Sequence, residues 1–182
     1  MGQQGAHICD VIFDNARIPA SSLLGDKEGK GFITAMQVLE RGRLHISAVC
    51  MGVADRLVED STKYAAERKQ FGAPIGNLQL VQAMLADSKM EHYAGRCMVI
   101  DAAKRRDAGE DVATESSCCK LFCSEAVGRI ADRAVQIHGG AGYVADYGIE
   151  RFYRDVRIFR LYEGTSQVQQ VIIARNMLKA VS

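Results

Sequence analysis

The sequence has very little proline and no run of apolar residues long enough to cross a membrane. Its two prolines among 182 residues are Pro19 and Pro74. Because proline interrupts helices, the proline-free stretch from Ile75 to Ser182 favours long helices. A membrane-spanning helix needs about 20 consecutive apolar residues, and the N-terminus lacks a secretory signal. We therefore expect no membrane anchor, and a location in the bacterial cytoplasm or, in a eukaryote, the mitochondrial matrix.

An excess of charge of one sign is also absent. Lysine and arginine number 23 against 22 acidic residues, giving a formal net charge of +1. A surface for nucleic acid or for anionic lipid would need a basic excess, so we expect neither as a partner. The six cysteines include no Cys-x-x-Cys pair. Cys118, Cys119 and Cys123 have no nearby histidine, so we interpret them as buried apolar residues and expect no metal site.

Apolar residues recur at helical spacing along most of the chain. They predict long helices over about residues 32–67, 77–107 and 111–138, a short helical piece at 149–155 and a last helix from about residue 166. We therefore expect an all-α fold built as an up-down four-helix bundle. The apolar stripes of the first and third helices are Phe32, Met36, Leu39, Ile46, Val53 and Leu57, and Cys119, Cys123, Ala126, Ile130, Ala134 and Ile137.

Residues typical of helix ends set the expected limits of these helices. Asn77 is a predicted N-cap for the second helix. The adjacent glycines Gly139 and Gly140 are expected to end the third helix. Ser166 and Gln169 have the spacing of a capping box at the start of the last helix.

The segment "HICDVIF", residues 7–13, differs from the rest of the chain. Its β-branched and aromatic residues predict a short β-strand, followed by a turn and a loop. A strand must pair with another strand, and the sequence predicts no second one. We therefore expect the partners of this β segment to be missing from the chain or supplied by another subunit.

Several short motifs carry little weight when each is taken singly. "GAGYVA", residues 140–145, matches a dinucleotide-binding pattern but follows a helix instead of a strand, which excludes a Rossmann site. Taken singly, Gly139 and Gly140 are sufficiently explained as a glycine cap that ends a helix. Arg68 is likewise sufficiently explained as an arginine exposed to solvent. Arg43 has the position of an arginine at the edge of a core. Glu163 suits the N-terminal end of a helix.

Four of these motifs together point to one family. "ERKQFGAPIGNLQ" (67–79), "QIHGGAGY" (136–143), "RFYRD" (151–155) and "LYEGTSQ" (161–167) occur in this order along a proline-poor helical chain. The set resembles the acyl-CoA dehydrogenase family, over about residues 8–179. The resemblance implies an enzyme that uses FAD to introduce a double bond between Cα and Cβ of an acyl-CoA thioester.

The resemblance implies that Glu163 is the base that removes the α-proton. Some family members carry the base on the first long helix, at the position of Gly42, which has no side chain to act. A carboxylate is a weak base in water, and apolar surroundings raise the pKa of a carboxyl group. Gly164 would leave space for the thioester. The residues expected to supply apolar surroundings are Ile158, Phe159, Leu161 and Tyr162.

The resemblance also implies partners. Arg68 and the segment 136–140 would serve an FAD held mainly by a neighbouring subunit, so a homodimer or homotetramer is expected. Glu40 and Arg43 would lie near the acyl-CoA. An electron-transfer flavoprotein would be the electron acceptor of the full enzyme. The residues assigned to FAD are Arg68, Phe71, Gln79, Gln136, Gly139, Gly140, Thr165 and Gln167.

The family has two further domains, an N-terminal helical one and a middle β-domain, that this sequence does not show. The resemblance assigns residues 1–26 to the end of the middle β-domain with a linker, and residues 27–182 to the C-terminal helical domain. We expect the chain by itself to be inactive or nearly so. The alternatives are an acyl-CoA oxidase or related flavoenzyme of the same superfamily, and a non-catalytic helical oligomerisation module.

Overall fold

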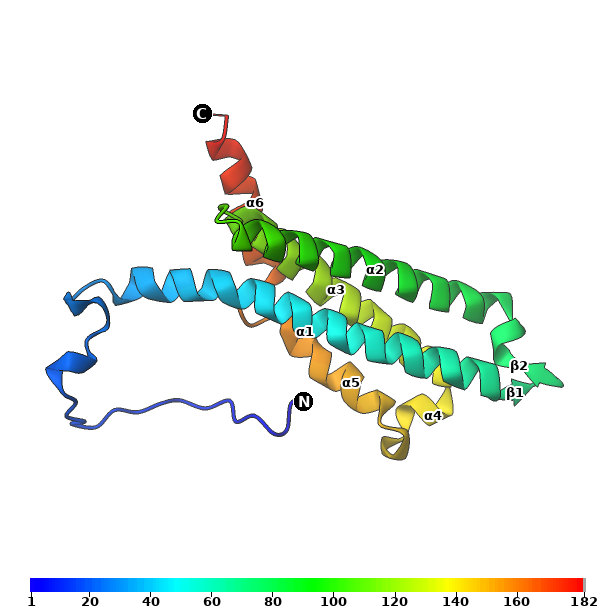
Figure 1. The fold of residues 1–182 in the computed structure, drawn as a ribbon. Coiled ribbons are helices and arrows are strands. Elements are labelled where there is room, and N and C mark those ends of the chain that lie inside the picture. Colours follow the sequence, from blue (N-terminus) through cyan, green and yellow to red (C-terminus); the bar gives the residue numbers. More distant parts are fainter. Residues whose placement is uncertain (182) are drawn as a thin grey trace.

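Three long antiparallel helices form the body of the protein, for which a computed structural model describes residues 1–181 (Figure 1). They are α1 (Gly31–Glu67), α2 (Gln79–Asp107) and α3 (Ala113–His138). α3 is the central helix, because it packs against α1 and α2 and also against α5 (Ile149–Val156) and α6 (Ser166–Lys179). The expected all-α architecture is confirmed.

Short elements connect the long helices. Two strands form an antiparallel hairpin between α1 and α2, in which Lys69 pairs with Pro74 and Gln70 with Ala73. Single turns of helix mark the other connections. The short elements are β1 (Lys69–Gln70), β2 (Ala73–Pro74), α4 (Gly140–Tyr143) and the 3₁₀ turns η1 (Ala20–Ser22), η2 (Leu24–Asp26), η3 (Ile75–Asn77), η4 (Ala145–Tyr147) and η5 (Arg157–Arg160).

The main core lies where α1, α3 and α5 meet. Small residues such as Ala54 and Ala131 are fully or almost fully buried there, which allows the helices to approach closely. All six residues of the predicted α3 stripe are buried, so that prediction is confirmed. Burial of the thiols raises the pKa of Cys50 and of Cys119 to about 12. Cys119 and Cys123 are buried core residues, as expected, whereas the expectation that Cys118 is buried is wrong, because it is only half-buried.

The predicted stripe of α1 is buried only in its later part. Leu57 is fully buried, and Ile46 and Val53 pack against the core. Phe32 is 75% exposed, and Met36 is also exposed. The first turns of α1 project beyond the ends of α2 and α3 (Figure 1), so these side chains have no neighbouring helix to cover them.

The predicted strand at residues 7–13 is wrong. The structure assigns no regular secondary structure to this segment, and its apolar residues are exposed, Phe13 to 82%. The physical reason is the lack of a pairing partner: within residues 1–181 the segment lies beside no strand with which it could form backbone hydrogen bonds. The start of the chain contacts α5, where the Arg154 guanidinium donates a hydrogen bond to the Met1 carbonyl at 2.8 Å.

Two predicted helix caps are also wrong. Leu78 is the N-cap of α2 and makes no side-chain capping bond, while Asn77 belongs to the preceding turn η3. At α6 the N-cap is Thr165, whose hydroxyl accepts a hydrogen bond from the Val168 N–H at 3.3 Å. The predicted capping box fails because the side chains at its two positions are engaged elsewhere: Ser166 Oγ donates to Glu125 at 2.7 Å.

The glycine pair ends α3 as predicted but also starts a new helix. Gly139 has a φ of +58°, a left-handed conformation that glycine adopts readily, and it caps α3. Gly140 is the first residue of α4. The pair therefore redirects the chain towards α5 within two residues.

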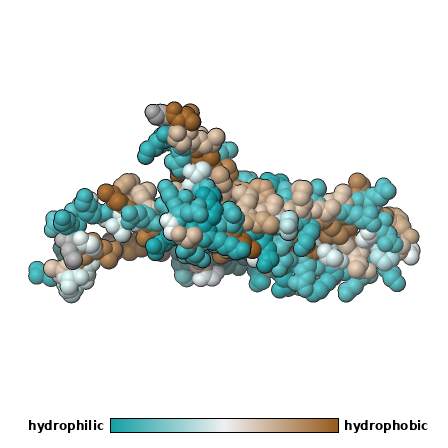
Figure 2. Space-filling model, turned by 45° about the horizontal axis from the view of Figure 1, so that its top comes forward, coloured by the Kyte–Doolittle hydropathy of each residue, from teal (hydrophilic) through white to brown (hydrophobic). Residues whose placement is uncertain are grey.

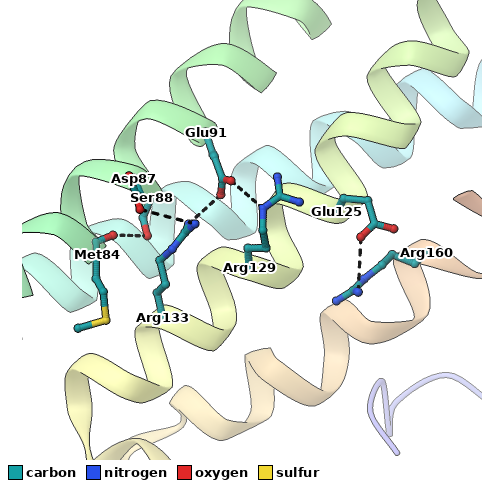
Figure 3. A network of polar contacts seen from close by, with 8 residues as sticks. All are labelled: Met84, Asp87, Ser88, Glu91, Glu125, Arg129, Arg133 and Arg160. Carbon is teal, nitrogen blue, oxygen red and sulfur yellow. Dashed lines mark hydrogen bonds and ion pairs between the residues drawn. The ribbon is translucent and has the colours of Figure 1, made fainter. Parts of the chain in front are cut away.

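A buried acidic residue joins α2 to α3 by ion pairs (Figure 3). Glu91, on α2, is largely buried and accepts from Arg129 at 2.7 Å and from Arg133 at 2.8 Å, both on α3. Asp87 lies 4.0 Å from Arg133. On the other side of α3, Glu125 lies 3.5 Å from Arg160 of η5. These pairs fix α3 relative to the helices on both sides of it.

The surface mixes polar and apolar residues, as Figure 2 shows for one face. Hydrophobic side chains gather at the projecting ends of the molecule, near the start of α1 and at the tip beyond α6 (Figure 2). Within residues 1–181, no helix is both long enough and apolar enough to cross a membrane.

Candidate active site

Glu163 lies in a tight turn between η5 and α6. Its φ is +58°, and that of Gly164 is +86°, so two consecutive residues have left-handed backbone. That region is sparsely populated by residues with a Cβ atom. A Cβ at position 164 would also lie 2.6 Å from Nε2 of Gln169. Both the backbone angle and the lack of space therefore require glycine after Glu163.

Two fully buried side chains hold this turn. Lys120, on α3, donates from Nζ to the Gly164 carbonyl at 2.6 Å. Gln169, in the first turn of α6, donates from Nε2 to the carbonyls of Glu163 and Gly164 at 3.1 Å each. The turn is thus fixed from both α3 and α6.

The Glu163 side chain lies directly against Gly42 of α1. A Cβ built on Gly42 would be 2.9 Å from Cδ of Glu163 and closer still to Oε2. Glu163 therefore occupies the space that any side chain at position 42 would need. Its Oε2 is buried and has no hydrogen-bond partner within the described chain. A carboxylate oxygen that is shielded from water and not engaged by a donor is suited to accept a proton.

Arg43 follows Gly42 and is half-buried beside the same site. Its Nε is buried without a hydrogen-bond partner among residues 1–181. The carbonyl of Arg43 accepts from Ser47 Oγ at 2.6 Å, within α1. Glu40, the other residue expected near the substrate, is half-buried one turn earlier on the same helix.

The surroundings of Glu163 are partly apolar. Phe159 is buried and stacks on the Tyr162 ring, with 5.9 Å between ring centroids. Burial, in the first place, raises the pKa of Tyr162, and the charge of Glu163 adds to this. Ile158 packs against the same core. Leu161 is 51% exposed and is thus less enclosed than Phe159.

A second cluster forms where α1 and α3 end, next to the hairpin. Arg68, Gly139 and Gly140 line one pocket of about 490 Å³ there. Tyr64 and His138 also line it, with their rings stacked at 4.2 Å. A guanidinium beside exposed glycine backbone and a stacked ring pair suits a ligand that carries both phosphate and a planar ring. The residues present therefore fit FAD.

The other residues expected at FAD do not join this pocket. Phe71 is 92% exposed at the tip of the hairpin, and Gln79 and Gln136 are exposed. Thr165 and Gln167 belong to the Glu163 end of the molecule, where Thr165 caps α6 and Gln167 is exposed.

The two clusters are far apart within one chain. Gly42 and Arg68 mark their positions along α1, and a helix rising about 1.5 Å per residue separates them by roughly 39 Å. A single cofactor could not contact both clusters of the same molecule.

Comparison with known proteins identifies the family. The sequence model for the family described as "Acyl-CoA dehydrogenase, C-terminal domain" matches residues 29–178. The chain belongs to the acyl-CoA dehydrogenase family.

The relatives of this chain include proteins named as reductases as well as proteins named as dehydrogenases. The chain is 45% identical over 179 residues to a 3-(aryl)acrylate reductase of Clostridium sporogenes, covering 98% of this chain and 47% of that protein. It is 41% identical over 179 residues to the CarC subunit of the caffeyl-CoA reductase-Etf complex of Acetobacterium woodii, again covering 98% and 47%. The chain spans about half the length of these curated relatives.

A solved structure in the family has the same helical arrangement. Butyryl-CoA dehydrogenase from Megasphaera elsdenii superposes with a TM-score of 0.88 at 36% identity, over 92% of this chain and 43% of that one. The helical domain of this acyl-CoA dehydrogenase family member is therefore folded like that of a solved homologue.

Lys120 and Tyr64 were not among the residues expected at a site. Lys120 follows the buried Cys119 in a segment where every other nearby residue is uncharged, "SSCCKLFCS". A single lysine inside an apolar helical stripe is a usable signal, because a buried amino group requires a partner. Its partner lies 44 residues away in the sequence, and only the folded chain brings the two together.

Proposed function

We propose that this chain supplies the catalytic base and part of the FAD contacts of an enzyme that dehydrogenates acyl-CoA thioesters between Cα and Cβ. The observation that carries the proposal is the Glu163 carboxylate, held against Gly42 with a buried oxygen free of hydrogen bonds. Family membership supports the same reaction class.

In the proposed reaction Glu163 removes a proton from Cα of the thioester. Breaking that C–H bond leaves an electron pair that forms the new double bond as hydride leaves Cβ. Bound FAD would supply the hydride acceptor. The N–H groups of Glu163 and Gly164 donate no hydrogen bond within the described chain, so both are free to bond the thioester oxygen as negative charge develops on it.

Substrate and cofactor contacts are assigned by position. Glu40 and Arg43, both half-buried in the same part of α1 as Gly42, would bind the acyl-CoA. Arg68 with Gly139 and Gly140 would hold the phosphate-bearing part of an FAD whose reactive ring lies at the Glu163 site of another subunit. The roughly 39 Å between the clusters supports this division and hence a homodimer or homotetramer.

The reverse direction is the second candidate. Two relatives carry the names of reductases, and one of them is a subunit of a complex with Etf. By microscopic reversibility the same Glu163 would return a proton to Cα during reduction of an enoyl-CoA. An electron-transfer flavoprotein would be the redox partner in either direction.

The test uses a hybrid enzyme, because the chain matches about half of its relatives. The N-terminal half of the Megasphaera butyryl-CoA dehydrogenase would be joined to residues 1–182 of this chain, and acyl-CoA-dependent dye reduction measured. We expect Glu163→Gln to lower kcat by roughly 10²–10⁴-fold while FAD content stays unchanged. Glu59→Gln, at an exposed carboxylate of α1, is the matched control. An unchanged kcat in Glu163→Gln would refute the proposal.

A further inference from the structure

Lys120 is buried in a way that no other lysine of the described chain is. Its side chain is fully buried in α3, whereas the lysines elsewhere in residues 1–181 are exposed. Within the same residues it forms no ion pair with a carboxylate. Burying an amino group is costly unless it is hydrogen-bonded. Its contact is the Gly164 carbonyl, at 2.6 Å.

The atom that Lys120 binds belongs to the turn that orients Glu163. Left-handed backbone at a residue with a Cβ persists only when its surroundings hold it. The carbonyl of Gly164 receives two donors, one from Lys120 and one from Gln169. Without the Lys120 amino group, the turn would be held only by the hydrogen bonds from Gln169 of α6, the helix that follows the turn.

The electrostatic environment also links Lys120 to the site. Burial is the largest influence on the pKa of Lys120 and lowers it. Cys50, Glu125 and Glu163 raise this pKa, in that order of influence, and the charge of Arg43 lowers it. Glu163 and Arg43 are therefore near enough to influence the charge of Lys120, and its direct contact is the hydrogen bond with the turn.

We propose that Lys120 is a positioning residue: its amino group holds the Gly164 carbonyl, fixes the left-handed turn and thereby keeps the Glu163 carboxylate against Gly42. Lys120 does not touch the substrate. The expected effect of Lys120 on catalysis rests on the proposed function of Glu163. The proposal that Lys120 stabilises the turn does not depend on that function.

Hydrogen exchange in the 182-residue chain tests the hold directly. Lys120→Met keeps the length of the side chain and removes its donor. We expect the hydrogen-bonded amides around the turn, those of Leu161, Tyr162, Val168 and Gln169, to exchange at least about tenfold faster, which corresponds to about 1.4 kcal/mol, with the protection of α1 and α2 unchanged. Lys104→Met, at an exposed lysine of α2, is the control. Unchanged exchange in the turn overturns the proposal, and so does a uniform increase throughout the helices.

Kinetics in the hybrid enzyme test the consequence for Glu163. Lys120→Met is expected to lower kcat about tenfold or more, because a small displacement of a catalytic group is costly, with a much smaller change in KM. An equal loss in a Glu163→Gln background would mean that Lys120 does not act through Glu163, and would overturn the proposal. If Glu163→Gln alone leaves kcat unchanged, the proposed function fails, and hydrogen exchange still decides whether Lys120 holds the turn.

A measurement on the unmutated chain covers the case in which Lys120→Met does not fold. With ¹⁵N-labelled lysine, the single buried amino group is expected to give one Nζ resonance whose protons exchange slowly with water. If all lysine Nζ protons exchange at the rate of exposed amines, Lys120 does not hold the carbonyl and the proposal is wrong.

Discussion

Gly42 stands in the middle of a long helix, where glycine is unfavourable by about 1 kcal/mol relative to alanine. Its neighbour explains its presence: the carboxylate of Glu163 fills the space where a side chain would be. The two positions are therefore linked by sterics, and a side chain at position 42 excludes the observed placement of Glu163. This relation connects one residue of α1 with one residue of a distant turn.

Gly42→Ala should consequently impair catalysis without unfolding the protein. The added methyl group would displace the Glu163 carboxylate, and a shift of about 1 Å at a catalytic group can cost about 100-fold in rate. We expect kcat of the hybrid enzyme to fall by about that factor. Gly52→Ala is the control on the same helix, because nothing lies within 4 Å of its added Cβ. Equal kcat values for the two variants would contradict the steric relation.

At the scale of elements, α3 determines where the site residues lie. It packs against α1, which carries Gly42 and Arg43, and against α6, which follows the Glu163 turn. The ion pairs of Glu91 fix α3 to α2 on one side (Figure 3). On the other side, Glu125 of α3 accepts a hydrogen bond from Ser166 at the start of α6. The orientation of α3 is thus coupled to the geometry of the turn.

Removing the charge of Glu91 should loosen this packing. Glu91→Gln keeps the shape of the side chain but leaves Arg129 and Arg133 with a weaker acceptor. We expect the free energy of unfolding to fall by about 1.5–3 kcal/mol, as for other hydrogen bonds to charged groups. Urea denaturation followed by circular dichroism measures this value. Glu59→Gln breaks an exposed pair with Lys63 and is expected to leave the midpoint nearly unchanged; an equal shift in both variants would argue against the buried network.

At the scale of the whole molecule, the two clusters of site residues lie too far apart to act on one cofactor within one chain. The apolar first turns of α1 and the exposed segment before them add uncovered surface (Figure 2). Large exposed apolar patches mark interaction sites. The chain is therefore expected to act as part of an assembly.

We expect the purified chain to be a homodimer or a homotetramer. Size-exclusion chromatography with light scattering gives the mass directly. Phe13→Ser, in the exposed N-terminal segment, distinguishes the two surfaces: an unaltered mass assigns the association to the helices, and a lower mass assigns it to this segment. A monomer at every concentration tested would contradict the division of the FAD contacts between subunits.

The sequence by itself determined the helices, the family and the identity of the candidate base. Apolar periodicity and the lack of proline depend on neighbouring residues, so α1, α2, α3 and α5 could be predicted closely. The motif that contains Glu163 and Gly164 could also be recognised from the sequence, because its residues are neighbours in the chain. A proposed strand at residues 7–13 failed because a strand depends on a partner as well as on its own residues.

Only the tertiary structure decided which residues support the site. Lys120 and Gln169 reach the turn from α3 and α6, and Gly42 meets Glu163 from α1. The capping interpretation of Gln169 was reasonable from its spacing, but the side chain makes its bonds to the turn instead. Such contacts join residues distant in the sequence, and their formation depends on how the helices pack, which local sequence patterns do not encode.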